Sequence, residues 1–489
     1  MSDYAELLLP AIRWTANGGY EQSLEEINRA LALGVGGFIF FGGVADKVRD
    51  LTADLRNRSR TSLLIGADLE RGAGQQFVGA TGLPPLAAIG SLNDAGAVVA
   101  AARVTAIEAR ALGINWIYAP VCDLDIEPEN PIVGTRSFGG DPTRVGVAVT
   151  QWVEACQDMG VLACAKHFPG HGRTTVDSHA ELPVVAASET DLVNTDLVPF
   201  EAAVDAGVAS VMSAHVAFPA LDPSSVPATL SSRILDGRLR GTMGFAGLIV
   251  TDALIMEGVL SGGESSAVVR ALQAGCDLLL YPKDLDACLN AIETAVQNGD
   301  LDRARLAESV ARRRHWADWA AAERGDRGLA DEEVRWADRI ADRVVHPMRN
   351  GMPNLSRQIE VVIVDDDLGG PYPPPSREPF VATLGERGFD VISAEPESAA
   401  RRSRVIALFG DIRSWKGRPG YSAGSLERVR VALDAAERAA VDSVIVQFSH
   451  PRLAAAIPGN GPVICAWGGD AVMQRAAARV LAAEVPTAG

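Results

Sequence analysis

The segment Ala165–His179 carries the densest group of residues in this chain that are able to do acid–base chemistry. Lys166 and His167 end an apolar run, and a loop with proline and glycine then leads to Asp177 and His179. A carboxylate two residues before an imidazole can bond to the ring, fix its tautomer and raise its basicity, as a general acid/base near neutral pH requires. An isolated Asp-x-His pair is more often part of a surface loop, so both interpretations stay open here.

A metal site in the same segment is not favoured. His167 and His171 stand four residues apart, a spacing that would put both rings on one face of a helix. Pro169 and Gly170 lie between them and break such a helix.

A second chemical element centres on Asp252, which closes the apolar run Gly247–Thr251. An aspartate at such a place is either a nucleophile aimed into a site or the N-cap of the next helix. We favour the nucleophile because of the architecture that the rest of the sequence predicts.

Alternating apolar runs and helical patterns occupy the first two thirds of the chain and predict parallel strands joined by helices. The number of units indicates an α/β fold with an N-terminal (β/α)₈ barrel. The expected strands are Leu7–Arg13, Val35–Phe41, Leu63–Glu70, Asn115–Asp123, Val161–His167, Ala209–Val216, Gly247–Asp252 and Cys276–Tyr281. In such a barrel the site lies at the carboxyl ends of the strands. The polar residues that close these runs are therefore expected to share one mouth, and they include Asp68, Glu70, Asp123 and His215.

The remaining sequence predicts a second domain. Helical patterns at Leu301–Glu323 and Asp331–Val345 trail the barrel, so we place the catalytic barrel at residues 1–345 and a linker at residues 346–358. Residues 359–489 are expected to form a smaller αβα sandwich around an open sheet.

Composition narrows the function classes. The 489 residues carry 62 acidic and 45 basic side chains, a net charge of −17 that repels nucleic acids and anionic membranes. The six cysteines contain no C-x-x-C pair, and Asp3 and Glu6 precede the first short apolar stretch, which is unlike a signal peptide. We therefore expect a cytoplasmic protein with buried thiols and with neither nucleic acid nor membrane as a partner.

Seven motifs resemble glycoside hydrolase family 3, in its β-N-acetylglucosaminidase branch. They occur in family order, cover the predicted barrel, and are Ala67–Glu70, Ala119–Asp125, Asn130–Gly139, Lys166–Gly172, Asp177–His179, Met212–His215 and Thr251–Asp252. The Lys-His-Phe-Pro-Gly-His-Gly run followed by Asp-Ser-His is the most specific of them. The C-terminal domain resembles two-domain members only in architecture.

The resemblance implies a retaining double displacement, in which Asp252 attacks the anomeric carbon and forms a covalent glycosyl-enzyme. It also implies that His179, oriented by Asp177, is the proton donor. Most other family members use a glutamate of the second domain and have tryptophan after the nucleophile, whereas Ala253 follows here.

The resemblance assigns sugar-hydroxyl contacts to Asp68, Arg136, Lys166 and His167. This chain departs from the family at Gln76, which stands where relatives have a sugar-pocket arginine. β-Glucosides therefore become plausible substrates beside β-N-acetylglucosaminides.

The acceptor of the second half-reaction is either water or phosphate. An ionised carboxylate acid/base at ~4 Å would repel phosphate by about 4 kcal/mol at an effective dielectric of roughly 20, whereas a deprotonated histidine is neutral. Arg173 lies in the same loop and could bind phosphate oxygens, although an exposed loop charge is an equally good interpretation. We expect a β-glycoside phosphorylase that releases sugar 1-phosphate, with a hydrolase that uses water as the alternative.

The expected partners are thus a small-molecule glycoside and inorganic phosphate as co-substrate, with no cofactor and no metal. A non-catalytic carbohydrate-binding barrel is a further alternative. The joint presence of Asp252, Asp177 and His179 disfavours it.

Overall fold

The computed structural model describes residues 3–178, 181–260, 262–322, 328–369, 374–413 and 416–483. They fall into two compact units, each of which is considered by itself. The first unit comprises Met1–Thr81, Asp94–Val133 and Ser137–Glu333. The second comprises Gly82–Asn93, Gly134–Arg136 and Val334–Gly489, so it begins before the linker expected at residues 346–358 and includes two short segments from within the expected barrel.

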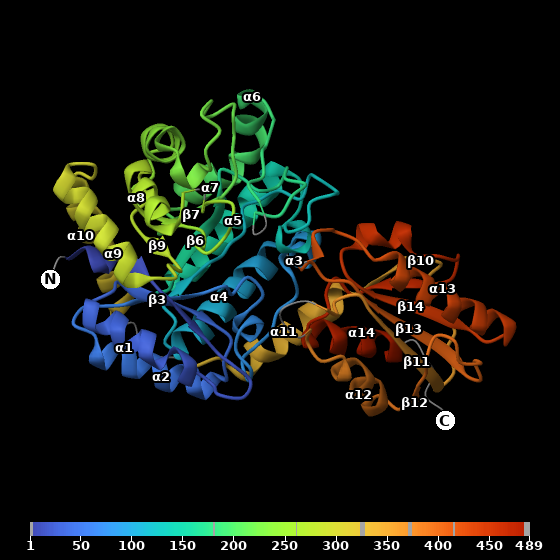
Figure 1. Cartoon of the computed structure of the whole chain (residues 1–489). Coiled ribbons are helices and arrows are strands. Elements are labelled where there is room, and N and C mark those ends of the chain that lie inside the picture. Colours follow the sequence, from blue (N-terminus) through green and yellow to red (C-terminus); the bar gives the residue numbers. More distant parts are fainter. Residues whose placement is uncertain are drawn as a thin grey trace. The chain divides into compact units, whose positions relative to one another are not determined.

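The first unit is built on a curled sheet whose strands run parallel (Figure 1). In the described residues its order follows the chain: β2 (Ala11–Arg13), β3 (Gly37–Phe41), β4 (Leu64–Ala67), β5 (Trp116–Ile117), β6 (Leu162–Phe168), β7 (Ser210–Ser213) and β8 (Leu248–Thr251). The expected α/β class and parallel sheet are therefore confirmed. Alternation of strand and helix along the chain produces this order because each helix returns the chain to the same end of the sheet.

A short parallel pair stands beside this sheet. β1 (Leu8–Leu9) pairs with β9 (Leu279–Leu280), and a single bridge joins Val250 of β8 to Leu278. Pro10 separates β1 from β2, since proline has no N–H to donate to a ladder.

Helices alternate with these strands and begin at recognisable caps. The Asp94 carboxylate accepts the N–H of Ala97 at the start of α4 (Ala95–Ala111), and Asp141 does the same for Arg144 in α5 (Pro142–Asp158). The other α-helices in the described part of this unit are α1 (Leu24–Leu33), α2 (Ala45–Arg58), α6 (Glu189–Asp191), α7 (Val198–Asp205), α8 (Glu264–Ala274), α9 (Leu285–Asn298) and α10 (Arg303–Ala321), and a π-helix at Arg233–Thr242 stands between β7 and β8. Among the described residues of the whole chain, no helix combines the length and the apolar character needed to traverse a bilayer.

The core enclosed by the curled sheet is apolar and fully buried. Side chains from the strands meet in one cluster, joined by Ala317 of α10; it includes Leu9, Ile39, Leu64, Trp116, Leu162, Met212, Leu248 and Leu280. A packed interior of this kind leaves the chemistry to the residues at the strand ends.

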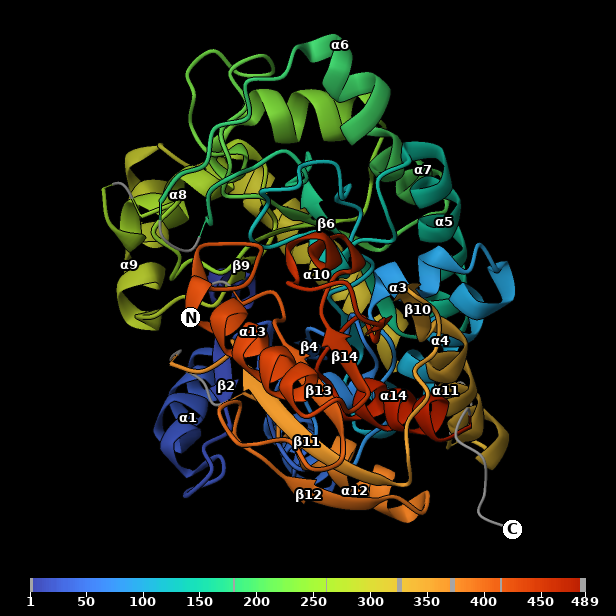
Figure 2. The same ribbon diagram turned by 90° about the vertical axis from the view of Figure 1, so that its right-hand side faces the viewer.

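The second unit contains a sheet of order β10-β15-β14-β13-β11-β12 in the described residues (Figure 2). Its strands are β10 (His346–Arg349), β11 (Gln358–Asp365), β12 (Asp390–Ser393), β13 (Ser403–Phe409), β14 (Ser443–Phe448) and β15 (Val463–Cys465). Alternate strand residues face two separate apolar clusters, one with α12 (Glu378–Glu386) and α14 (Ala471–Ala483), the other with α13 (Ala423–Arg438). Helices therefore cover both faces of this sheet. The unit also contains α3 (Leu86–Ser91) and most of α11 (Asp331–Val344).

Two edge strands of this sheet differ from the sequence-based expectation. β10 lies within residues 346–358, where we expected a linker, and pairs antiparallel with β15 at the sheet edge, a place that tolerates Pro347. β12 has only one half-buried residue, Val391, so its sequence lacks the apolar run by which strands are detected.

Candidate active site

Three of the predicted site segments stand at the same edge of the curled sheet. Asp68 directly follows β4, Lys166 and His167 lie in the last residues of β6, and Asp252 directly follows β8. Carboxyl ends of parallel strands share one edge, so these polar groups are brought to one side of the unit.

Lys166 is buried between two carboxylates. Its Nζ lies 2.7 Å from Asp68 Oδ1 and 2.7 Å from Glu70 Oε1, and the lysine itself is 1% exposed. The Glu70 side chain is also buried, whereas the Asp68 side chain is 29% exposed. The ammonium is thus held in place while Asp68 stays open to a ligand. We had not assigned a role to Glu70, although it closes the Ala67–Glu70 motif.

His167 is held by Asp123, a second partner to which we had assigned no role. Asp123 Oδ2 lies 2.7 Å from His167 Nδ1, and Oδ1 accepts the backbone N–H groups of His167 and His171 at 3.2 and 2.6 Å. Burial alone would raise the pKa of Asp123, but the adjacent histidines and their N–H groups hold that pKa below its ordinary value. The carboxylate therefore stays ionised and fixes the orientation of the His167 ring.

Asp252 is half-buried at the end of β8. Its N–H donates to the carbonyl of Ser213 at 3.2 Å, and its Oδ1 accepts the N–H of Ala253 at 2.7 Å. Residues 253–260 form turns, and the next helix of the described chain is α8, so the alternative of a helix N-cap does not occur here.

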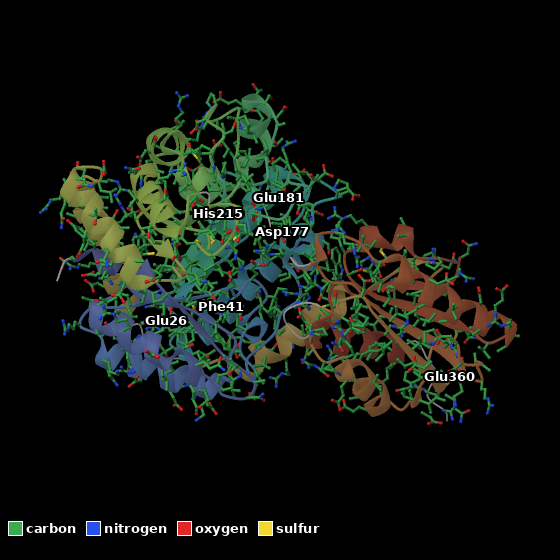
Figure 3. The ribbon with its side chains drawn as sticks, viewed as in Figure 1. Glu26, Phe41, Asp177, Glu181, His215 and Glu360 are labelled. Atoms are coloured by element: carbon green, nitrogen blue, oxygen red, sulfur yellow. The ribbon has the colours of Figure 1, made fainter. Side chains whose placement is uncertain are left out.

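The loop after β6 brings Asp177 into the same unit. Asp177 is 5% exposed, and Ser178 beside it lies 3.0 Å from His171 through Oγ and Nε2. The charge of Asp252 acts on the pKa of His171, so this loop lies within electrostatic range of that carboxylate. Figure 3 labels Asp177 and also His215, which stands two residues after the end of β7. His179 lies outside the described residues.

The other predicted contacts have partners of their own. The Gln76 side-chain oxygen accepts the N–H of Gly42 at 3.0 Å. Arg173 donates from Nε to Asp196 at 2.8 Å and from Nη2 to Thr195 Oγ1 at 2.9 Å, so a carboxylate already balances its charge.

Arg136 belongs to the short 3₁₀ helix Gly134–Arg136, which is described with the second unit. Gly134 has a φ of +36°, a backbone conformation that L side chains rarely adopt, so this turn favours glycine. The Arg136 side chain is half-buried.

In the part of the chain that the structure describes, no three His, Cys, Asp or Glu side chains are arranged to hold a metal ion. The site groups are instead carboxylates, one ammonium and imidazoles. Such a set can donate and accept hydrogen bonds around a polyhydroxylated ligand, and it includes the half-buried carboxylate of Asp252.

Comparison with known proteins agrees with this arrangement. Residues 6–314 match the glycosyl hydrolase family 3 N-terminal domain. The chain is 36% identical over 290 residues to a β-N-acetylglucosaminidase/β-glucosidase of Cellulomonas fimi, which covers 57% of this chain but only 51% of that relative. It is 34% identical over 293 residues to a β-hexosaminidase of Nitrosomonas eutropha, covering 56% of this chain and 83% of the relative.

A solved structure extends the likeness to the second unit. The glycoside hydrolase family 3 β-N-acetylglucosaminidase of Paenibacillus sp. str. FPU-7 is 29% identical, with a TM-score of 0.87 over 99% of this chain and 96% of that one. The match of the family model to more than half of the chain, together with the strand-end groups described above, identifies the chain as a member of glycosyl hydrolase family 3.

Proposed function

We propose that this protein cleaves terminal β-linked sugars by a retaining double displacement with Asp252 as the nucleophile. The observation that carries the proposal is the half-buried carboxylate directly after β8, on the sheet edge that also holds Lys166, Asp68 and His167. β-N-Acetylglucosaminides and β-glucosides are the proposed substrates, since one relative is named a β-N-acetylglucosaminidase/β-glucosidase and another a β-hexosaminidase.

The proposed site needs the mouth of a barrel, and we infer that the curled sheet closes into the (β/α)₈ barrel expected from the sequence. The bridge between Val250 and Leu278 and the parallel pairing of β9 with β1 support the closure. Closure would gather the strand ends around one opening.

In the first step, Asp252 attacks the anomeric carbon and the glycosidic bond breaks. The aglycone oxygen takes a proton from His179, whose role is inferred from the family resemblance and from the buried carboxylate of Asp177 two residues before it. Asp68 and the Nε2 side of His167 would bind sugar hydroxyls, while Glu70 and Asp123 hold their partners in place.

The covalent step can be tested by trapping. Incubation with an aryl 2-deoxy-2-fluoro-β-glycoside should add one fluorosugar to the intact mass, and peptide mapping should locate it on Asp252. The Asp252→Asn variant should not be labelled, and a label on any other residue rules out the proposed nucleophile.

The proton-transfer role can be tested by leaving-group dependence. His179→Ala should lower kcat/KM by at least about 100-fold for an alkyl β-glycoside and far less for a dinitrophenyl glycoside, because an activated leaving group needs no proton. Equal losses on both substrates would remove His179 from the acid role.

Phosphate as the acceptor is a second candidate, favoured by the use of an imidazole in place of a second carboxylate. A neutral base does not repel an incoming phosphate, whereas a carboxylate at ~4 Å would cost about 4 kcal/mol. The ion pair between Arg173 and Asp196 weakens the phosphate-binding role that we expected for Arg173, so this candidate depends on the histidine. Initial rates with and without inorganic phosphate, with assay of sugar 1-phosphate, decide between phosphorolysis and hydrolysis.

A further inference from the structure

His171 is a fully buried histidine of the site loop to which neither the sequence nor the proposed mechanism gives a role. It is 1% exposed. Its Nδ1 lies 2.6 Å from Thr174 Oγ1, and its Nε2 lies 3.0 Å from Ser178 Oγ. Ser178 stands between Asp177 and His179, so the ring contacts the residue that joins the two members of the proposed dyad.

The hydrogen bonds around the ring favour one tautomer. The Thr174 hydroxyl donates to the carbonyl of His171 at 3.0 Å, so its oxygen is left to accept a proton from Nδ1. Burial lowers the pKa of His171 to about 4, so the ring carries a single proton near neutral pH. Nε2 is then an acceptor, and the Ser178 hydroxyl donates to it.

The backbone of His171 is anchored as well. Asp123 accepts the backbone N–H of His171 at 2.6 Å, and Asn130 Nδ2 donates to the carbonyl of His171 at 2.8 Å. The same Asp123 carboxylate orients His167. The buried Asp123 carboxylate thus fixes two residues. One is His167, which we propose binds the sugar, and the other is His171, which contacts Ser178.

Ser178 is also held by the segment that follows Asp252. The N–H of Gly258 donates to the Ser178 carbonyl at 3.3 Å. A Cβ on Gly258 would lie 3.0 Å from that carbonyl oxygen and 3.2 Å from the carbonyl oxygen of His215, so the two loops meet closely at a glycine. Ser178 therefore lies between the His171 ring and the loop of the proposed nucleophile.

We propose that His171 is a positioning residue whose Nε2 holds Ser178, and with it the neighbouring Asp177 carboxylate, against the loop that follows Asp252. This inference rests on the proposed function. His171 acts through Ser178 and touches neither the sugar nor the reacting atoms.

Substitution of His171 by glutamine or asparagine distinguishes its contact with Ser178 from its contact with Thr174. His171→Gln places an amide oxygen near the position of Nε2 and can still accept from Ser178, whereas His171→Asn reaches only the Nδ1 position beside Thr174. His171→Asn should lower kcat/KM for an alkyl β-glycoside by about 10- to 100-fold, since a displacement of about 1 Å costs that much. Its loss on the dinitrophenyl glycoside should stay below about threefold, and His171→Gln should restore most of the activity on the alkyl substrate.

Ser178→Ala supplies the second arm. It should reproduce the leaving-group pattern of His171→Asn, and the double variant should lose no more than either single variant because both changes break one contact. If His171→Asn does not fold, the pattern of Ser178→Ala alone decides. Equal losses on both substrates, additive losses in the double variant, or failure of His171→Gln to restore activity would each overturn the inference.

The same assay distinguishes failure of the proposed Asp177–His179 dyad from failure of the positioning role of His171. If His179→Ala shows no selective loss on the alkyl substrate, the proposed dyad fails. If His179→Ala shows that loss while His171→Asn and Ser178→Ala do not, the dyad stands and only the positioning role of His171 is rejected.

Discussion

At the scale of single residues, the site depends on buried partners that restrain the groups facing the ligand. Lys166 lies between Asp68 and Glu70, and Asp123 holds His167. Lys166, Glu70 and Asp123 are almost fully buried, so their charges are weakly screened and their effect on orientation is large. Lys166 and His167 are thus held in fixed orientations at the end of β6.

Removing the charge of Glu70 should weaken the fold. Glu70→Gln leaves Lys166 with one carboxylate, so we expect a loss of about 2 kcal/mol, less than the roughly 3–5 kcal/mol of a fully orphaned buried charge. Urea unfolding at pH 7 measures the change. The exposed pair of Glu427 with Arg430 supplies the control, since Glu427→Gln should change stability little. An equal effect of the two substitutions would contradict this view of Lys166.

His171 should make stability depend on pH. Its folded-state pKa of about 4 lies below the ordinary value of 6.5, so the unfolded chain binds a proton first and stability falls as the pH drops from about 6.5 toward 4. The expected loss from this group between pH 7 and pH 5 is about 2 kcal/mol. Urea midpoints at both values should show a smaller decrease for His171→Gln than for the wild type; parallel decreases would contradict the prediction.

At the scale of elements, local signals place the strands and helices that carry these residues. α5 begins where Asp141 accepts the N–H of Arg144 at 2.9 Å, with Pro142 in the first turn. β6 is continuously apolar up to Lys166 because both of its faces are covered. These short-range features decide where the site residues emerge from the sheet.

Loss of the α5 cap should therefore reduce stability without affecting catalysis. Asp141→Ala should cost about 1 kcal/mol, because the Arg144 N–H loses its acceptor. Thermal unfolding measures the shift, and kcat/KM per folded molecule should not change. Glu154→Ala, on the exposed face of the same helix, should stay within about 0.5 kcal/mol of the wild type. A destabilisation by Glu154→Ala as large as that by Asp141→Ala would indicate a general effect of the helix rather than its cap.

At the scale of the first unit as a whole, α10 connects distant parts of the chain. Asp277, fully buried before β9, pairs with Arg312 at 2.5 Å and Arg305 at 3.3 Å from α10, and with Arg240 at 2.5 Å. Arg313 of the same helix pairs with Glu6 near the N-terminus. These ion pairs fasten α10 to the segments that precede β1 and β9.

Asp277→Asn should test this fastening. Loss of the carboxylate leaves several guanidinium groups without their shared acceptor, so we expect a destabilisation of about 3 kcal/mol. Urea unfolding at low and high salt should show nearly the same difference, because the pair is buried. Asp286→Asn, which removes an exposed partner of Arg29, is the control and should have little effect. A difference that disappears in 1 M salt would show that the pair is solvated.

The sequence by itself determined the α/β class, the parallel order of strands and the strand-end positions of Asp68, Lys166 and Asp252. Periodicity, helix caps and family motifs are properties of neighbouring residues, so they can be read without knowing what packs against them. The sequence patterns did not predict the edge strands β10 and β12. An edge strand needs no continuous apolar run, and not all of its N–H groups donate to a neighbouring strand.

Only the tertiary structure decided the partners. Lys166 lies 98 residues from Asp68 in the sequence, and Asp123 lies 44 residues from His167, so no local pattern could pair them. Folding also gave Arg173 a carboxylate partner in Asp196, which the isolated loop sequence could not indicate. Charge and orientation in a buried site are set by packing between distant segments, because a desolvated ion is stable only where the fold supplies its counter-ion.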